Sequence, residues 1–262
     1  MSIVFAAITP HSPFLIPSIG KENLLRLKAT ESAFKKLEED LYVSKAETIL
    51  IISPHGVIQP NSFTMNVSPE FVANFEDFGD LTTKINLAGD IGLAHKIRER
   101  METRVPLQLI SERKLDYGSG VPLYLLTPHL PKIKIIPVYY SGLSMEAHLK
   151  FGQSLKRELM VNKNRVAIIA SGDLSHKLTR DAPAGYSPKG KKFDQKIIDH
   201  LLNKKTNDII KLKHNLLAEV CECGLKSIII LLGTMGGINY QPQTLSYEAP
   251  FGVGYLVMKF GL

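Results

Sequence analysis

The sequence is poor in cysteine and has no long apolar run, and each shortage excludes a class of protein. Its two cysteines, Cys221 and Cys223, are one residue apart, which is too close for an ordinary structural disulfide. So few thiols suit a reducing compartment, and we expect a cytoplasmic protein. The longest apolar stretches, such as residues 228–232, fall far short of the ~20 residues that a membrane helix needs. The apolar start at residues 2–8 has no basic segment before it and is followed at once by prolines, unlike an export signal.

Acidic residues are fewer than basic ones, but the basic residues do not form one patch in the sequence. The chain has 32 Lys and Arg against 25 Asp and Glu, a net charge of +7. The lysines are scattered, and no Arg-rich stripe with interleaved aromatic residues is present, as nucleic-acid binding would require. The densest cluster, Lys189, Lys191 and Lys192, falls at an expected helix start. We interpret the charge as a solvated surface and expect no nucleic-acid or membrane partner.

Apolar segments of strand and helix type alternate along all 262 residues. No linker, repeat or low-complexity stretch interrupts them, so we expect a single domain over residues 1–262. The alternation predicts an α/β fold in which a mostly parallel central sheet is sandwiched between helices, with a C-terminal antiparallel hairpin. The expected strands are residues 2–8, 47–53, 63–67, 82–87, 107–110, 132–139, 165–170, 244–247 and 252–260. The expected helices are residues 21–41, 91–101, 145–160, 193–202, 208–220 and 225–232.

Three histidines and a glutamate follow apolar strands directly. In open α/β sheets, sites lie beyond the carboxyl ends of the strands. His11 and His55 follow the first two strands, His176 follows the strand at 165–170, and Glu248 ends the strand at 244–247. Two imidazoles and one carboxylate form the facial triad of non-haem Fe(II) sites, which leaves positions open for substrate and dioxygen. We therefore expect His11, His55 and Glu248 to bind one Fe(II), although Zn(II) would accept the same ligands.

Other residues near these strand ends have candidate roles. His176 is a candidate general base; the alternatives are a metal ligand in place of Glu248 or a group that supports a ligand. Asp173 either orients a ring nitrogen or caps a turn. Tyr117, in a glycine-containing segment before an apolar helix, either donates a hydrogen bond to substrate or belongs to an ordinary loop. Asp173 and Tyr117 are thus candidate substrate-binding residues. Cys221 and Cys223 could bind metal, but two buried cysteines in a helix are the favoured interpretation.

Five segments together resemble a known family. TPHSPFLIP, ISPHG, LDYGSGVPLYLL, IASGDLSHKLTRDAPAGY and LSYEAPFGVGY occur in this order from the first residues to the last. They are similar to the class III extradiol ring-cleavage dioxygenases, catalytic (B) subunit type, and within them to the AmmeMemoRadiSam system branch with its Memo-like relatives. The resemblance implies an Fe(II) held by His11, His55 and Glu248, with His176 as acid/base on a catechol hydroxyl. Ring-cleaving members usually carry a histidine at the position of Tyr117, and tyrosine cannot take up a proton near neutral pH.

The expected function is therefore that of a non-haem Fe(II)-dependent, extradiol-type dioxygenase. Its partners would be a small catechol-like aromatic and O2, which places it in aromatic compound metabolism. The alternatives are a Memo-like metal-binding protein without ring cleavage and a metal-dependent hydrolase. A homo-oligomer, or a partner protein of the AmmeMemoRadiSam system, is compatible with the resemblance.

Overall fold

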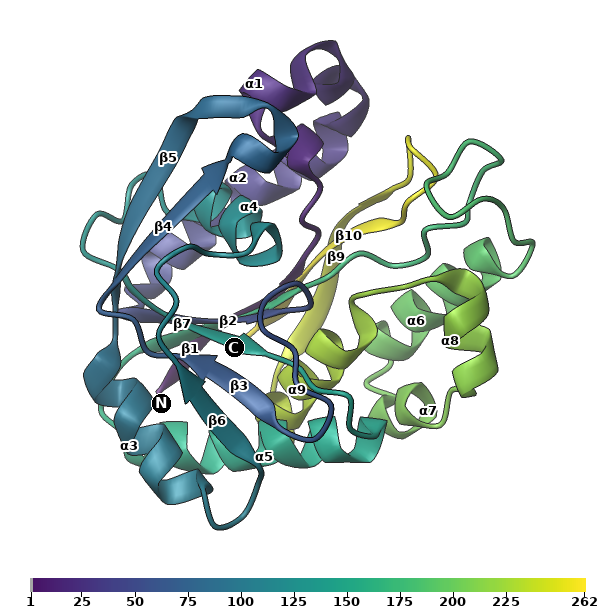
Figure 1. Cartoon of the computed structure of the whole chain (residues 1–262). Coiled ribbons are helices and arrows are strands. Elements are labelled where there is room, and N and C mark those ends of the chain that lie inside the picture. Colours follow the sequence, from purple (N-terminus) through teal and green to yellow (C-terminus); the bar gives the residue numbers. More distant parts are fainter. Residues whose placement is uncertain (1) are drawn as a thin grey trace.

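The computed structural model describes residues 2–262, and its centre is a twisted sheet (Figure 1). Parallel strands form the middle of this sheet: β7 (Lys134–Tyr139), β2 (Thr48–Ser53), β8 (Val166–Ser171) and β1 (Ile3–Thr9), side by side in that order. Every residue of β2 and β8 is buried. Such uniform burial requires helices on both faces of a sheet, which explains why these strands are almost wholly apolar in sequence.

Strands in mixed orientation complete the sheet beside β7, and two antiparallel strands complete it beside β1. The path runs β4-β5-β7-β2-β8-β1-β10-β9, with β3 pairing with β6 and β7 off this path. The predicted C-terminal hairpin is confirmed, and its second strand pairs antiparallel with β1. The bounds are β3 (Phe63–Asn66), β4 (Glu70–Phe75), β5 (Asp80–Gly89), β6 (Leu107–Ile110), β9 (Gln241–Glu248) and β10 (Tyr255–Gly261).

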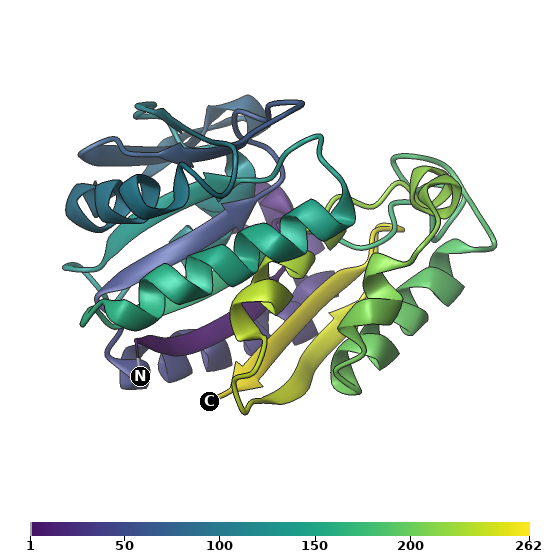
Figure 2. The same ribbon diagram turned by 90° about the horizontal axis from the view of Figure 1, so that it is seen from below.

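Two layers of helices cover the two faces of the sheet (Figure 2). On one face lie α2 (Lys28–Ser44) and α4 (Tyr117–Leu126), and α2 buries Phe34, Leu37 and Leu41 at helical spacing. The other face carries α3 (Ile91–Met101), α5 (Met145–Val161), α6 (Gly190–Leu202), α7 (Thr206–Ile210), α8 (His214–Val220) and α9 (Leu225–Met235). The short helices are η1 (Pro13–Leu15), α1 (Pro17–Gly20), η2 (Lys21–Leu27) and η3 (Glu76–Phe78). The predicted α/β architecture is confirmed.

Three elements differ from the expectation. The helix expected from residue 21 becomes α-helical only at Lys28, because Lys21 has a positive φ of 47° and a 3-10 segment follows it. The helix expected over residues 208–220 is divided into α7 and α8. Strand β4 was not predicted, since EFVANF contains alanine and asparagine, which are depleted in strands. None of the helices within residues 2–262 is both long enough and apolar enough to cross a membrane.

Candidate metal centre

The carboxyl ends of β1, β2 and β8 bring three chain segments together. Strand β8 lies between the other two, with Ser171 opposite Thr9 and Ala170 opposite Ile52. The residues just beyond these ends therefore lie at one edge of the sheet, as the parallel arrangement requires. His11, His55 and Asp173 all occupy this position.

His11 and His55 are in direct contact. Their Nε2 atoms are 3.0 Å apart, and the rings meet edge to face with centroids 4.7 Å apart. The Sγ atom of Cys223 lies 3.6 Å from Nε2 of His11. The potential ligand atoms of these three residues all lie within 4.8 Å of one another. Two imidazole nitrogens and one sulfur thus converge on a volume that a single cation can occupy.

A second group of potential ligands shares the same cysteine. The ligand atoms of Asp173, His176 and Cys223 also lie within 4.8 Å of one another. One carboxylate oxygen of Asp173 accepts the backbone N–H of His11 at 3.1 Å, and the other lies 3.6 Å from Nε2 of His11. Nδ1 of His176 is buried and has no hydrogen-bond partner within residues 2–262. Asp173 therefore fixes the His11 backbone, and His176 lies in the same group of potential ligands.

Cys223 was missed by the sequence analysis, and the prediction of two buried helical cysteines is wrong. Cys221 is exposed and ends α8 with a φ of 51°, and Cys223 is half-buried in the turn before α9. This turn approaches β8 very closely, because a Cβ atom on Gly172 would lie 2.1 Å from Cα of Gly224. The backbone N–H of Asp173 donates to Sγ of Cys223 at 3.3 Å. No spacing in the sequence connects this turn with His11.

Glu248 has a different partner from the two histidines. Its Oε1 accepts the backbone N–H of Thr30 at 2.8 Å, in the first turn of α2. The N-cap residue of α2, Leu27, has no side chain that could accept this N–H, so a carboxylate at the positive end of the helix dipole satisfies it. No group of three potential ligands found in the described chain includes Glu248. Its role as a ligand stays a prediction, and the potential ligand atom that lies beside the histidines is Sγ of Cys223.

Tyr117 lies against His55 from the start of α4. Its hydroxyl is 2.9 Å from Nε2 of His55, and the two rings stack with centroids 4.4 Å apart. Asp116 caps this helix by accepting the N–H of Ser119 at 3.0 Å, so the helix begins at Tyr117 within the predicted loop. Burial raises the pKa of the Tyr117 phenol, which keeps its proton at neutral pH.

Burial also sets the protonation of the three converging residues. It lowers the pKa of His11 to about 3 and that of His55 to about 4, with smaller effects from neighbouring histidines. Both rings are therefore neutral at pH 7 and can offer a lone pair. Burial raises the pKa of the Cys223 thiol well above its ordinary value, so without a cation the thiol keeps its proton. Neutral nitrogens and a sulfur suit iron, zinc or copper and do not suit magnesium or calcium.

Asp173 shows the same influence of its surroundings. Burial raises the pKa of its carboxyl group to about 6, against the opposing effect of His176 and of the His11 N–H. A carboxyl group of this kind exchanges its proton near neutral pH. It therefore adds a group that can exchange a proton to the side of the centre where His176 lies.

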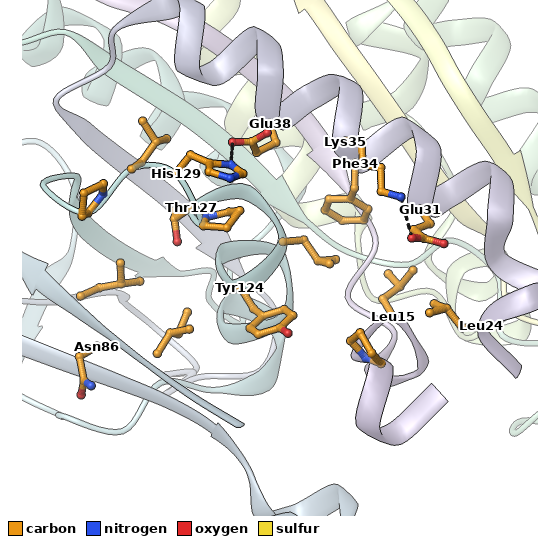
Figure 3. Close-up of a pocket in the computed structure, with 17 residues that line it drawn as sticks. Leu15, Leu24, Glu31, Phe34, Lys35, Glu38, Asn86, Tyr124, Thr127 and His129 are labelled. Atoms are coloured by element: carbon orange, nitrogen blue, oxygen red, sulfur yellow. Dashed lines mark hydrogen bonds and ion pairs between the residues drawn. The ribbon is translucent and has the colours of Figure 1, made fainter. Parts of the chain in front are cut away.

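Two cavities border this part of the fold, and only one reaches the centre. A cavity of about 410 Å³ is lined by His55 and Tyr117 together with Phe78, Asn74 and Tyr139. A larger one of about 540 Å³ lies between α2, α4 and β5 (Figure 3). Its walls are mainly apolar, and Glu38 pairs with His129 at its margin. The smaller cavity is the one next to the candidate ligands.

Three known proteins are similar to this chain over most of its length. A protein of Clostridium acetobutylicum is 30% identical over 99% of this chain, which spans 58% of that protein's length. The Escherichia coli 3,4-dihydroxyphenylacetate 2,3-dioxygenase is 23% identical over 95% of this chain and 96% of its own. A MEMO1 family protein of Methanococcoides burtonii is 23% identical over 94% of this chain and 85% of its own.

Fold and family follow from two further comparisons. The crystal structure of an uncharacterized protein from E. coli K12 superposes with a TM-score of 0.73 at 16% identity, covering 98% of this chain and 100% of that one. Residues 5–258 match the family model described as the catalytic LigB subunit of aromatic ring-opening dioxygenase. This match covers nearly the whole chain, including His11, His55, Tyr117, His176 and Cys223, and the chain therefore belongs to the LigB family.

Proposed function

We propose that this chain is an oxygen-dependent metalloenzyme, which holds one divalent iron with His11, His55 and Cys223 and acts on a catechol-like aromatic. The observation that carries the proposal is the convergence of these three ligand atoms within 4.8 Å of one another. The proposal of a catechol-like substrate rests on the family and on the similarity to the E. coli 3,4-dihydroxyphenylacetate 2,3-dioxygenase. Zn(II) would fit the same donors, so the donor set alone does not select iron.

Cys223 is preferred to Glu248 as the third ligand because of where their donor atoms lie. Sγ of Cys223 lies 3.6 Å from Nε2 of His11 and belongs to a group of potential ligands with both histidines. Oε1 of Glu248 accepts the N–H of Thr30 in the first turn of α2, and no group of three potential ligands found in the described chain includes Glu248.

The roles proposed for the remaining residues follow from where their hydrogen-bonding groups lie. When bound, the metal would supply a common centre for the substrate oxygens and dioxygen. His176, which lies in the group of potential ligands with Asp173 and Cys223, would accept the proton of a substrate hydroxyl and later return it. Tyr117 would donate its phenolic hydrogen bond to a substrate oxygen. Asp173 would hold His11 through the backbone N–H.

The cavity beside His55 has the size that an aromatic ring needs, and aromatic as well as charged side chains line it. About 410 Å³ falls within the range of small-molecule sites. The ring of Phe78 lies edge to face with that of Tyr117, with centroids 5.2 Å apart. A planar substrate entering from this side would meet His55 and Tyr117 first.

A second candidate function is that of a Memo-like metal-binding protein that does not cleave rings. One observation favours it: the position of a histidine in ring-cleaving relatives is held by Tyr117, whose hydroxyl is 2.9 Å from Nε2 of His55. A phenol at that position cannot exchange protons near neutral pH. The similarity to a MEMO1 family protein agrees with this candidate.

The deciding experiment is an anaerobic Fe(II) titration of metal-stripped protein. The wild type is compared with Cys223→Ala and with the matched control Cys221→Ala, whose thiol is exposed and two residues away. We expect one equivalent of Fe(II) in the wild type and the control and a loss of binding in Cys223→Ala. Full binding by Cys223→Ala would refute the ligand set. Oxygen uptake with a catechol panel then separates the two functions, since binding without uptake supports the Memo-like candidate.

A further inference from the structure

A buried proline frees a carbonyl group next to the candidate metal centre. In an α-helix, the carbonyl of residue i accepts the N–H of residue i+4. For Gly118 in α4 that residue is Pro122, which has no N–H. The helix nevertheless continues to Leu126, and Gly118 and Pro122 are both buried. The Gly118 carbonyl therefore needs a partner from outside the helix.

Ser171, the last residue of β8, is this partner. Its hydroxyl donates to the Gly118 carbonyl oxygen at 2.5 Å, and the side chain is fully buried. The same Oγ lies 3.0 Å from Nδ1 of His11. A hydroxyl group has one proton, and here the carbonyl takes it. Toward His11, the Ser171 oxygen can therefore only accept, and the proton between them belongs to Nδ1.

We propose that Ser171 is a positioning residue that holds His11 in the tautomer protonated at Nδ1, and that Pro122 enables this by leaving the Gly118 carbonyl free. In this tautomer Nε2 carries a lone pair and faces Cys223 and His55, as a ligand must. In the opposite tautomer Nε2 carries a hydrogen and cannot bind a cation. The inference rests on the proposed function only in treating His11 as a ligand.

The same reasoning assigns the tautomer of His55 in the metal-free protein. The two Nε2 atoms are 3.0 Å apart, which requires one hydrogen between them. Since Nε2 of His11 carries no hydrogen, the hydrogen must lie on Nε2 of His55. The Tyr117 hydroxyl oxygen lies 2.9 Å from the same nitrogen and can also accept this hydrogen. The two neighbouring rings thus have opposite tautomers in the metal-free protein. To bind a cation through Nε2, His55 would have to change to the tautomer protonated at Nδ1, with its hydrogen moving from Nε2 to Nδ1.

The test is ¹⁵N NMR of histidine side chains in the metal-free protein, where each tautomer has a distinct pair of nitrogen shifts. Signals are assigned with His11→Gln and His55→Gln. We expect the Nδ1–H form for His11 in the wild type and in Ser171→Thr, which keeps a hydroxyl. Ser171→Ala should convert His11 wholly or partly to the Nε2–H form. Pro122→Ala, which restores an N–H for the Gly118 carbonyl, should change it in the same direction. An Nε2–H form in the wild type, or unchanged shifts in Ser171→Ala, would overturn the inference.

A metal titration links the tautomer to the centre and separates two kinds of failure. Ser171→Ala should bind Zn(II) about 10–100-fold more weakly than the wild type, with unchanged stoichiometry, and Ser171→Thr should recover most of the affinity. If the wild type binds no metal but its His11 has the Nδ1–H form, the proposed function fails and the assignment of the tautomer stands. If metal binds equally well to wild type and Ser171→Ala, the positioning role fails and the proposed ligand set stands.

Discussion

Sγ of Cys223 lies 3.6 Å from Nε2 of His11, although 212 positions separate the two residues in the sequence. The contact joins the turn before α9 to the end of the first strand. It also decides which of two ligand sets is favoured, because Glu248 is bonded to the start of α2. The two assignments make opposite predictions for the same variants.

Replacing Glu248 should affect stability and leave metal binding intact. Glu248→Ala removes the acceptor of the Thr30 N–H, and we expect the free energy of unfolding to fall by about 1 kcal/mol. Glu248→Gln keeps an oxygen that can accept this N–H and should lose less. Urea unfolding measures the stability, and Fe(II) titration measures the binding. A folded Glu248→Gln variant that no longer binds iron would return Glu248 to the ligand set.

Removing the imidazole of His176 should slow turnover without releasing metal. If catechol cleavage is observed, His176→Ala should lower kcat about 10²–10⁴-fold, since the imidazole would be the proton acceptor. Metal content, measured by elemental analysis, should equal that of the wild type. His95→Ala, in an exposed position of α3, serves as the control. Loss of metal together with activity in His176→Ala would make His176 a ligand and not a base.

Tyr117 is the position at which the reaction type can be tested. Tyr117→His introduces the side chain that ring-cleaving relatives carry there. We expect the rate of oxygen uptake with catechols to rise at least about tenfold. A well-positioned general acid or base contributes about 10² or more to a rate, and a newly introduced histidine should supply part of this. Tyr117→Phe removes the hydroxyl that lies 2.9 Å from His55 and supplies no exchangeable proton. It should show no such rise. Equal rates of oxygen uptake in Tyr117→His and Tyr117→Phe would contradict this prediction. They would show that the lack of a proton-transferring side chain at position 117 does not limit the reaction.

The close approach of Gly172 and Gly224 should not tolerate a side chain. Gly172→Ala would place a methyl group 2.1 Å from Cα of Gly224, so the turn that carries Cys223 must move away from β8. We expect a loss of about 1–3 kcal/mol in stability and weaker metal binding. The control is Gly92→Ala in α3, where the nearest atom to the new methyl lies 4.0 Å away. Wild-type affinity in Gly172→Ala would show that the turn does not need its present position.

Asp194 predicts a specific pH dependence of stability. Its carboxylate accepts the N–H of Ser175 at 2.9 Å and the hydroxyl of Tyr247 at 2.7 Å, and burial raises its pKa from 3.8 to about 7. The folded chain therefore binds this proton more tightly than the unfolded chain. The stabilisation is complete below about pH 4 and is lost as the pH rises toward 7, by at most about 4 kcal/mol.

Asp194→Asn isolates this contribution, because other titrating groups remain in both proteins. Urea midpoints between pH 5 and pH 8 should fall more steeply with rising pH in the wild type than in the variant. Above pH 7 the variant should be the more stable protein. Parallel curves for the two proteins would show that Asp194 does not titrate in this range.

The histidines could be predicted from the sequence because they follow strands of a recognisable kind. Residues 48–53 and 166–171 form wholly buried strands, and the rule for parallel sheets then selects the next residues. The same rule selected Glu248 at the end of β9, which lies two strand positions from β1 and four from β2, and its role as a ligand stays a prediction. The loops after β1 and β2 close over β8, which lies between them, and Glu248 lies beyond β10.

Cys223 and the division of α7 from α8 could not be predicted for a common reason. Both depend on how the region between β8 and α9 packs against the sheet. The turn before α9 is placed by the contact of Gly224 with Gly172, which a local pattern does not reveal. Residues 211–213, where the expected helix is interrupted, contain no proline or glycine. Ile209, Ile210, Leu217 and Val220 all enter the same core, which outweighs the local preference for one continuous helix.

The order of the proposed donors along the chain has a consequence for biosynthesis. His11 and His55 leave the ribosome early, whereas Cys223 follows after most of the sheet has been translated. Until then the two imidazoles could bind a cation only without the proposed sulfur ligand. A nascent chain would therefore exchange metal freely with its surroundings, and the choice of metal would be made at the end of translation, under the concentrations that the finished protein meets.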